Sequence, residues 1–172
     1  MARSLSGGAL LVKTPGTMKI TTSWTSKMKL SAGDGAHTVS MDAKSPGGED
    51  SALSPKQLVL AGLGGCTTMD VLSLLTKHKQ PLEAYELVAE AEMSAHGHPK
   101  VFTKIHLSFL VAGAVDAKIL VESVQLSQTR YCGVSAMLNP TVPISYTVLL
   151  NGHEIAAGRA DFSQTGKAHE SK

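Results

Sequence analysis

The first part of the chain alternates between apolar and polar side chains. Between residues 18 and 30 the apolar residues occupy even-numbered positions, and lysines and threonines occupy most of the odd-numbered ones. Because successive side chains of a strand point to opposite faces, this alternation predicts one half-buried antiparallel strand over 18–30. Turn-forming residues follow at 31–35. Renewed alternation then predicts a second strand that begins with His37, Val39 and Met41.

A long apolar segment from Ser54 to Lys79 comes next, after a loop at 44–51 that contains proline and glycine. Ser54 is a suitable N-cap, Pro55 suits the first helical position, and Gln57 lies three residues after the cap. The apolar side chains that follow are Leu58, Val59, Leu60, Ala61, Leu63, Met69, Val71, Leu72, Leu74 and Leu75. They cover every side of a helix, which predicts that this central helix is buried.

Three glycines interrupt the central helix, at positions 62, 64 and 65. They predict a helix broken into two halves and too interrupted to span a membrane. Cys66 is then expected at or near the start of the second half, where free backbone N–H groups and the helix dipole favour negative charge. A thiol in that position has a lowered pKa and a larger fraction of the reactive thiolate.

The middle of the chain predicts a β-hairpin. Alternation over 85–95 and again over 101–111 leaves one apolar and one polar face on each strand, which is typical of antiparallel sheet. The turn between them contains His96 and His98. We interpret both as solvent-exposed turn residues, because a metal site needs third and fourth ligands and the sequence contains no Cys-x-x-Cys. His106, on the polar side of its strand, is expected to be solvated.

A second helix and two further strands complete the pattern. Asp116 is a plausible N-cap for a helix that runs towards Gln128, and a short apolar segment follows after Cys132. Alternation over 142–150 predicts the last long strand. Asn151 and Gly152 are typical of a type I′ turn, which predicts a short returning strand around Ile155.

Together these elements predict an α+β fold in the order ββ-α-ββ-α-ββ, with an antiparallel sheet packed on the broken central helix and the second helix. We expect one domain over 18–162, between flexible tails at 1–17 and 163–172. A single sheet covers only one side of an all-apolar helix. The simplest solution is a homodimer in which two sheets enclose both central helices.

Composition narrows the class of protein. The chain has 172 residues, 17% of them charged, with a net charge of +2, which does not favour nucleic-acid binding. Two cysteines are too few for a secreted disulfide scaffold, and no membrane span is expected. We therefore predict a cytoplasmic protein. The first 33 residues contain no Asp or Glu, which leaves an organelle transit peptide as the alternative to a plain tail.

The two cysteines are the main candidates for chemistry. Cys66 at a helix start and Cys132 at the break after the second helix are expected to be half-exposed, and such a pair suits a nucleophile and its resolving partner. The alternative for each is a small buried apolar residue. A disulfide requires Cα atoms about 5.5 Å apart, and the sequence alone leaves this pairing open.

Two segments resemble the OsmC/Ohr family of thiol peroxidases: the run from Ser54 to Val71 and the run from Arg130 to Ala136. The resemblance covers roughly residues 18–150. It implies an intertwined homodimer with the reactive thiols at the subunit interface. It also implies an antioxidant enzyme of the oxidative stress response that reduces organic hydroperoxides without a metal, cofactor or prosthetic group.

By this resemblance Cys66 is the peroxidatic cysteine and Cys132 the resolving one. The Cys66 thiolate attacks the hydroperoxide and becomes a sulfenic acid, with which Cys132 condenses to a disulfide. An external dithiol, from a lipoyl protein or a thioredoxin-like protein, must then reduce that disulfide.

The family also uses an Arg and a Glu near the thiolate, and here the sequence departs from it. Lys56 stands where well-known members have the Glu, and no arginine lies between Arg3 and Arg130. The expected substitutes are Glu49 or Asp50 for the carboxylate and, for the cation, Lys19, Lys27, Lys56 or Arg130. Because a lysine point charge does not reproduce an arginine fork, rate and substrate range are expected to differ from those of the family.

Two other functions remain open. The missing Arg and Glu favour a non-catalytic redox sensor or small-molecule binding protein on the same scaffold. Acyl transfer on Cys66 ranks last, because no histidine near the motif is placed as a general base.

Overall fold

The computed structural model describes residues 16–164. They form two compact units, one up to Pro55 and one from Lys56 onwards, and the predicted domain over 18–162 contains both. The predicted tails at 1–17 and 163–172 lie almost wholly outside the described residues.

The first unit contains a three-stranded antiparallel sheet, in the order β1-β2-β3. Its strands are β1 (Thr21–Ser26), β2 (Lys29–Gly33) and β3 (Thr38–Met41). The prediction of one strand over 18–30 was wrong, because the chain turns at Lys27, which has a φ of 43°. A two-residue turn preserves the alternation: Trp24 pairs with Leu30, so both lie on the same face of the hairpin.

The predicted half-burial was wrong for β1 within the single chain, whereas β2 is partly buried. All six residues of β1 are exposed, and Trp24 retains 66% of its accessible surface. Among the described residues, the first unit has strands and loops but no helix to cover the apolar face of its sheet. Alternation thus located the apolar face correctly without revealing whether this chain covers it.

The second unit contains a four-stranded sheet in the order β4-β5-β6-β7. Its strands are β4 (Leu82–Met93), β5 (Phe102–Gly113), β6 (Ile144–Leu150) and β7 (His153–Arg159). The predicted hairpins β4-β5 and β6-β7 are confirmed. The prediction of a wholly antiparallel sheet was wrong, because β5 and β6 pair in parallel. Parallel neighbours need a crossover connection, and the helical segment between β5 and β6 supplies it.

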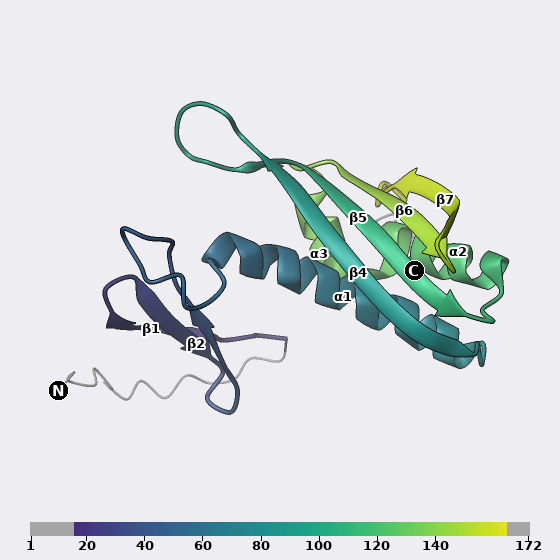
Figure 1. Cartoon of the computed structure of the whole chain (residues 1–172), viewed down its shortest axis with the longest axis horizontal. Helices are drawn as coiled ribbons and strands as arrows, with labels where there is room; N and C mark the ends of the chain where they lie inside the picture. The colour runs from purple at the N-terminus through teal and green to yellow at the C-terminus, as the bar shows by residue number, and fades with distance from the viewer. Residues whose placement is uncertain (1–15, 165–172) are drawn as a thin grey trace, which may run out of the picture. The chain divides into compact units, whose positions relative to one another are not determined.

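Four helical segments accompany this sheet: α1 (Pro55–Lys77), α2 (Ala117–Leu126), the π-helix η1 (Ser127–Tyr131) and α3 (Gly133–Leu138). The predicted cap of the second helix is confirmed, since the Asp116 side chain accepts from the backbone N–H groups of Lys118 and Ile119. In Figure 1 the helices lie behind the sheet, on one of its faces. The core between them contains Leu63, Val71, Leu75, Ile105, Leu107, Phe109, Leu120, Val124, Ile144 and Val148.

The central helix is continuous, contrary to the predicted break. It spans 23 residues from Pro55 to Lys77 and includes all three glycines. A glycine costs a helix about 1 kcal/mol, which the burial of Leu63, Val71 and Leu75 outweighs. Gly64 allows a close approach of the sheet, because a Cβ at this position would lie 3.2 Å from Leu87 Cδ2.

By length and composition, α1 is the one helix within residues 16–164 that could cross a membrane. The prediction that the three glycines make this segment too interrupted to span a membrane is therefore not supported. The core helix of a soluble protein passes the same test, and α1 contributes four buried side chains, Leu63, Thr67, Val71 and Leu75.

Candidate functional site

The structure brings Cys66, Asp70 and Cys132 together in the second unit. The two sulfur atoms and a carboxylate oxygen of Asp70 all lie within 4.8 Å of one another. Cys66 and Asp70 are four residues apart on α1, a spacing that places both side chains on the same side of the helix. Cys132 is the N-cap of α3. Within residues 16–164 this is the one group of three such side chains close enough to hold a metal ion.

Cys132 is completely buried, and neighbouring groups fix its sulfur. The backbone N–H of Ser135 donates to Cys132 Sγ at 3.4 Å, and Thr67 Oγ1 lies 3.3 Å from the same atom. Gln128 connects both neighbours, since its Nε2 donates to Thr67 Oγ1 at 3.2 Å and its Oε1 accepts from Ser135 Oγ at 3.1 Å. The predicted position of Cys132 at a helix edge is therefore confirmed, whereas its predicted half-exposure was wrong.

Cys66 is partly exposed and lies in the middle of α1. Because α1 is unbroken, its own backbone offers Cys66 no free N–H groups. The N–H of Val134, in the first turn of α3, interacts with the sulfur instead and lowers its pKa. Burial opposes this effect and is the largest cause of a net raised pKa, to which Cys132 and the charge of Asp70 also contribute. The prediction of a lowered pKa is contradicted.

Asp70 is the member of the cluster that the sequence analysis missed. Burial raises the pKa of its carboxyl group, and the Ser127 hydroxyl opposes that rise by donating to Oδ2 at 3.0 Å. The spacing of four residues after Cys66 was the available signal, because it puts a carboxylate one helical turn from the sulfur.

Tyr85 on β4 is a second polar group that the sequence analysis missed. Its hydroxyl oxygen is buried and has no hydrogen bond of good geometry among the described residues. Burial strongly raises the pKa of this phenol, and the charge of Asp70 adds to the rise, while the Thr68 hydroxyl opposes it. Tyr85 therefore remains a neutral phenol.

The predicted carboxylates Glu49 and Asp50 lie in the first unit, outside the cluster's own unit. Glu49 forms an exposed ion pair with Lys27 at 2.6 Å. The N–H of Asp50 donates to the carbonyl of Ala43, and its φ is 52°. The cation candidates Lys19 and Lys27 belong to this first unit too. Their proposed role beside the thiol stays a prediction.

The other two predicted cations lie in the second unit. Lys56 is exposed in the first turn of α1, ten residues before Cys66, which corresponds to about 15 Å along the axis. Arg130 is exposed near the end of η1, with its guanidinium carbon 5.6 Å from the centre of the Tyr131 ring. Neither charge contributes to the pKa shift of the Cys66 thiol.

The histidines within residues 16–164 take no part in the cluster. His96 and His98 are exposed in the turn between β4 and β5, as predicted. His106 differs from its prediction, because it is only partly exposed and its ring nitrogens lie 2.9 Å from Ser145 Oγ and 3.1 Å from Thr147 Oγ1. The neighbouring strand β6 supplies both hydroxyls, so the parallel pairing of β5 and β6 explains this environment.

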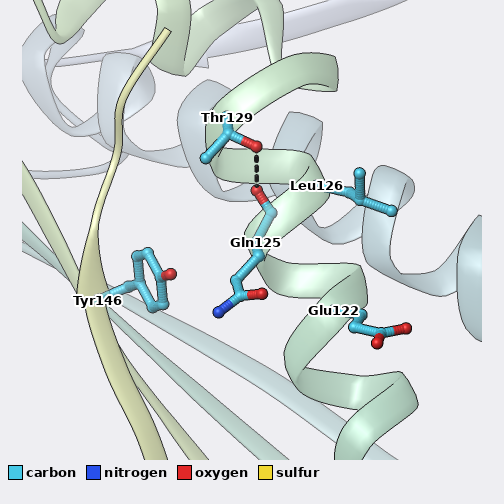
Figure 2. Close-up of a pocket in the computed structure, with 5 residues that line it drawn as sticks. All are labelled: Glu122, Gln125, Leu126, Thr129 and Tyr146. Atoms are coloured by element: carbon cyan, nitrogen blue, oxygen red, sulfur yellow. Dashed lines mark hydrogen bonds between the residues drawn. The ribbon is translucent and has the colours of Figure 1, made fainter.

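A surface pocket of about 480 Å³ lies between strand β6 on one side and helices α2 and η1 on the other (Figure 2). Neither cysteine lines it. Its lining consists of Glu122, Gln125, Leu126, Thr129 and Tyr146. Thr129 is fixed by donating its hydroxyl to the carbonyl of Gln125 at 2.7 Å. Because neither a thiol nor a histidine lines it, this pocket offers less chemistry than the Cys66–Asp70–Cys132 cluster.

The sequence of this chain is similar to those of known proteins. Residues 48–147 match a family model described as OsmC-like protein. Protein YhfA of Escherichia coli K12 is 36% identical over 113 residues, covering 64% of this chain and 81% of YhfA.

Two solved structures show the same fold. A hypothetical protein from Aquifex aeolicus VF5 superimposes with a TM-score of 0.66 at 25% identity, covering 78% of this chain and 97% of that one. A protein from Legionella pneumophila described as an organic hydroperoxide resistance protein superimposes with a TM-score of 0.61 at 19% identity. The match covers 79% of this chain and 98% of the Legionella protein. The predicted α+β fold is confirmed.

Proposed function

The chain belongs to the OsmC-like protein family, and we propose that it is a cysteine-based peroxidase that reduces organic hydroperoxides to alcohols. The observation that carries the proposal is the approach of Cys66 Sγ to Cys132 Sγ within 4.8 Å. The description of the Legionella pneumophila protein as an organic hydroperoxide resistance protein supports the choice of substrate.

In the proposed reaction the Cys66 thiolate attacks the distal peroxide oxygen, the O–O bond breaks, and the alcohol leaves with one proton. Cys66 is then a sulfenic acid. Cys132 attacks its sulfur and water leaves, which yields a Cys66–Cys132 disulfide. The two thiols thus supply the two electrons that the hydroperoxide takes up. An external dithiol, carried by a lipoyl or thioredoxin-like protein, restores both thiols, and no prosthetic group takes part.

The neighbouring groups suit this sequence of steps. Asp70 is close enough to accept the Cys66 proton, directly after a side-chain rotation or through one water molecule. The N–H of Val134 stabilises the Cys66 thiolate, and the N–H of Ser135 stabilises that of Cys132. Asp70 thus replaces, in our proposal, the carboxylate that the family usually places at the position of Lys56.

We also propose that the working unit is a cytoplasmic homodimer. Although α1 is apolar around its circumference, only Leu63, Thr67, Val71 and Leu75 are buried within the chain. Met69 keeps 74% of its surface exposed and Val59 keeps 42%. A second copy would remove this apolar surface from water, which is favourable in proportion to the area covered.

The experiment that tests the proposal is turnover of cumene hydroperoxide with dihydrolipoamide or dithiothreitol as the reductant. We expect Cys66→Ser to abolish consumption and Cys132→Ser to stop cycling after oxidation of Cys66. Met137→Leu, an exposed apolar exchange in α3, is the matched control and should retain activity. Wild-type protein that shows no turnover with any dithiol donor would remove the proposal.

The departure from the family's Arg and Glu leaves one competing function, a redox sensor or small-molecule binding protein on the same scaffold. A sensor needs only one oxidation per stimulus. The sensor predicts stoichiometric oxidation of Cys66 without turnover. Steady-state cycling in the same assay would exclude it.

A further inference from the structure

The Cys66–Asp70–Cys132 cluster has a composition that also suits a metal ion. It combines two thiols and a carboxyl group at one point of the core, with all three ligand atoms inside 4.8 Å. Thiolate and carboxylate are both zinc ligands, and three protein ligands with one open position are typical of accessible zinc sites.

We propose that the reduced protein binds one Zn²⁺ ion through Cys66 Sγ, Cys132 Sγ and a carboxylate oxygen of Asp70. This ion site goes beyond the proposed peroxidase function, which uses no metal. Water or another small ligand completes the tetrahedron from the side of Cys66, the sulfur that is not fully buried.

The distances fit zinc after a small adjustment. With Zn–S bonds of about 2.3 Å, two sulfurs of a tetrahedral site lie about 3.8 Å apart. The two sulfur atoms now lie at most 4.8 Å apart, so they would have to approach each other by about 1 Å at most. A rotation about χ1 of one cysteine can move its sulfur this far. The spacing of four residues between Cys66 and Asp70 presents two ligands from one side of α1, as the two histidines of the His-Glu-x-x-His zinc motif are presented.

Groups around the cluster hold the ligands in position. Ser127 Oγ donates to Asp70 Oδ2 at 3.0 Å, which leaves the other carboxylate oxygen for an ion. Ser135 and Thr67 hold Cys132 through its sulfur. Such outer hydrogen bonds orient metal ligands and raise affinity in known zinc proteins.

The charges also favour a cation. When ionised, the three ligands carry three negative charges at close range, since their ligand atoms lie within 4.8 Å of one another. Zn²⁺ removes this repulsion, and its binding releases the thiol protons to solvent. It also occupies the sulfur electron pairs that attack peroxide, so we expect Zn²⁺ to inhibit turnover reversibly.

The test uses the full-length reduced protein, freed of metal by a chelator and kept without oxygen. Co²⁺ added as a zinc probe should produce a thiolate-to-metal charge-transfer band, and one Zn²⁺ per chain should compete it away. Cys66→Ser, Cys132→Ser and Asp70→Asn each remove a ligand, so each should weaken Zn²⁺ binding by at least the roughly 10- to 100-fold that loss of an outer hydrogen-bond partner costs. Glu90→Gln, an exposed acid of β4, is the matched control and should bind as the wild type does.

A second measurement avoids the question of whether the variants fold. In wild-type protein, Zn²⁺ should protect both cysteines from iodoacetamide, and removal by chelator should restore their reactivity. Absence of stoichiometric Zn²⁺ binding to reduced wild type, or an affinity that Asp70→Asn leaves unchanged, overturns the ion site.

The two proposals can fail separately. Zn²⁺ binding without hydroperoxide turnover leaves the ion site standing and removes the peroxidase. Turnover that Zn²⁺ does not inhibit, in protein that retains no Zn²⁺, leaves the peroxidase standing and removes the ion site.

Discussion

Cys66 Sγ and Cys132 Sγ lie within 4.8 Å of each other, although one belongs to the middle of α1 and the other caps α3. Each helix carries a single cysteine, so the two sulfur atoms meet only when the helices pack together. The contact depends on α1 and α3 packing on the same face of the sheet, so any change that loosens this packing separates the two thiols.

The first prediction concerns the disulfide. One equivalent of cumene hydroperoxide should link Cys66 to Cys132, because the two sulfur atoms already lie within 4.8 Å of each other. Only a short approach separates them from the disulfide bond length of about 2.05 Å. A peptide map under non-reducing conditions should contain the joined peptides within the wild-type chain. An over-oxidised Cys66 with Cys132 still free would contradict the assigned resolving role.

The second prediction concerns the thiol pKa of Cys66 in metal-free protein. Burial raises this pKa, and the negative charge of Asp70 raises it further by disfavouring a second negative charge nearby. Asp70→Asn should therefore lower it and shift the pH profile of iodoacetamide alkylation towards lower pH. The Cys132→Ser protein provides a background in which Cys66 is the one remaining cysteine. A profile that moves to higher pH would contradict the assigned charge effect.

The third prediction concerns acid stability and involves Asp42, which is 3% exposed. The pKa of its carboxyl group is lowered by hydrogen bonds from the backbone N–H and the hydroxyl of Ser51, and from the N–H groups of Ala43 and Glu49. A carboxyl whose pKa is lower when folded stabilises the protein above the unfolded pKa of about 3.9. That stability should be lost as the pH falls through the folded pKa.

The measurement for Asp42 is the urea midpoint of unfolding as the pH falls from about 5 to about 2. Asp42→Asn should be less stable at neutral pH and should lose less stability on acidification, because an amide cannot ionise. A variant with the same pH slope as wild type would show that other carboxyl groups cause the loss.

The fourth prediction concerns the buried network around Cys132. Thr67→Val keeps the shape of the side chain but removes the acceptor at 3.2 Å from Gln128 Nε2, which leaves one of its N–H groups unpaired while the other keeps Ser127 Oγ at 3.5 Å. An unpaired buried donor costs about 1–3 kcal/mol, so the free energy of unfolding should fall by this amount. Thr67→Ser retains the hydroxyl and is the control. Equal stability of the two variants would contradict a role for the hydroxyl.

The sequence predicted most elements of the second unit because their patterns are local. Asp116 capped its helix as expected, and the turn at Asn151 and Gly152, with φ values of 51° and 81°, joined the two predicted strands. These outcomes depend on backbone geometry within a few residues, which residue type determines directly.

By itself, then, the sequence determined the α+β class, the strand faces, the family and the two cysteines that are the candidates for chemistry. Only the tertiary structure decided that α1 is continuous, that β6 runs parallel to β5, and that Asp70 is the carboxyl group beside Cys66. Glycine breaks a helix only where packing does not outweigh its cost, and here the buried leucines and valine of α1 hold it together. The pKa of Cys66 likewise depends on burial and on charges from distant parts of the chain, which no local pattern contains.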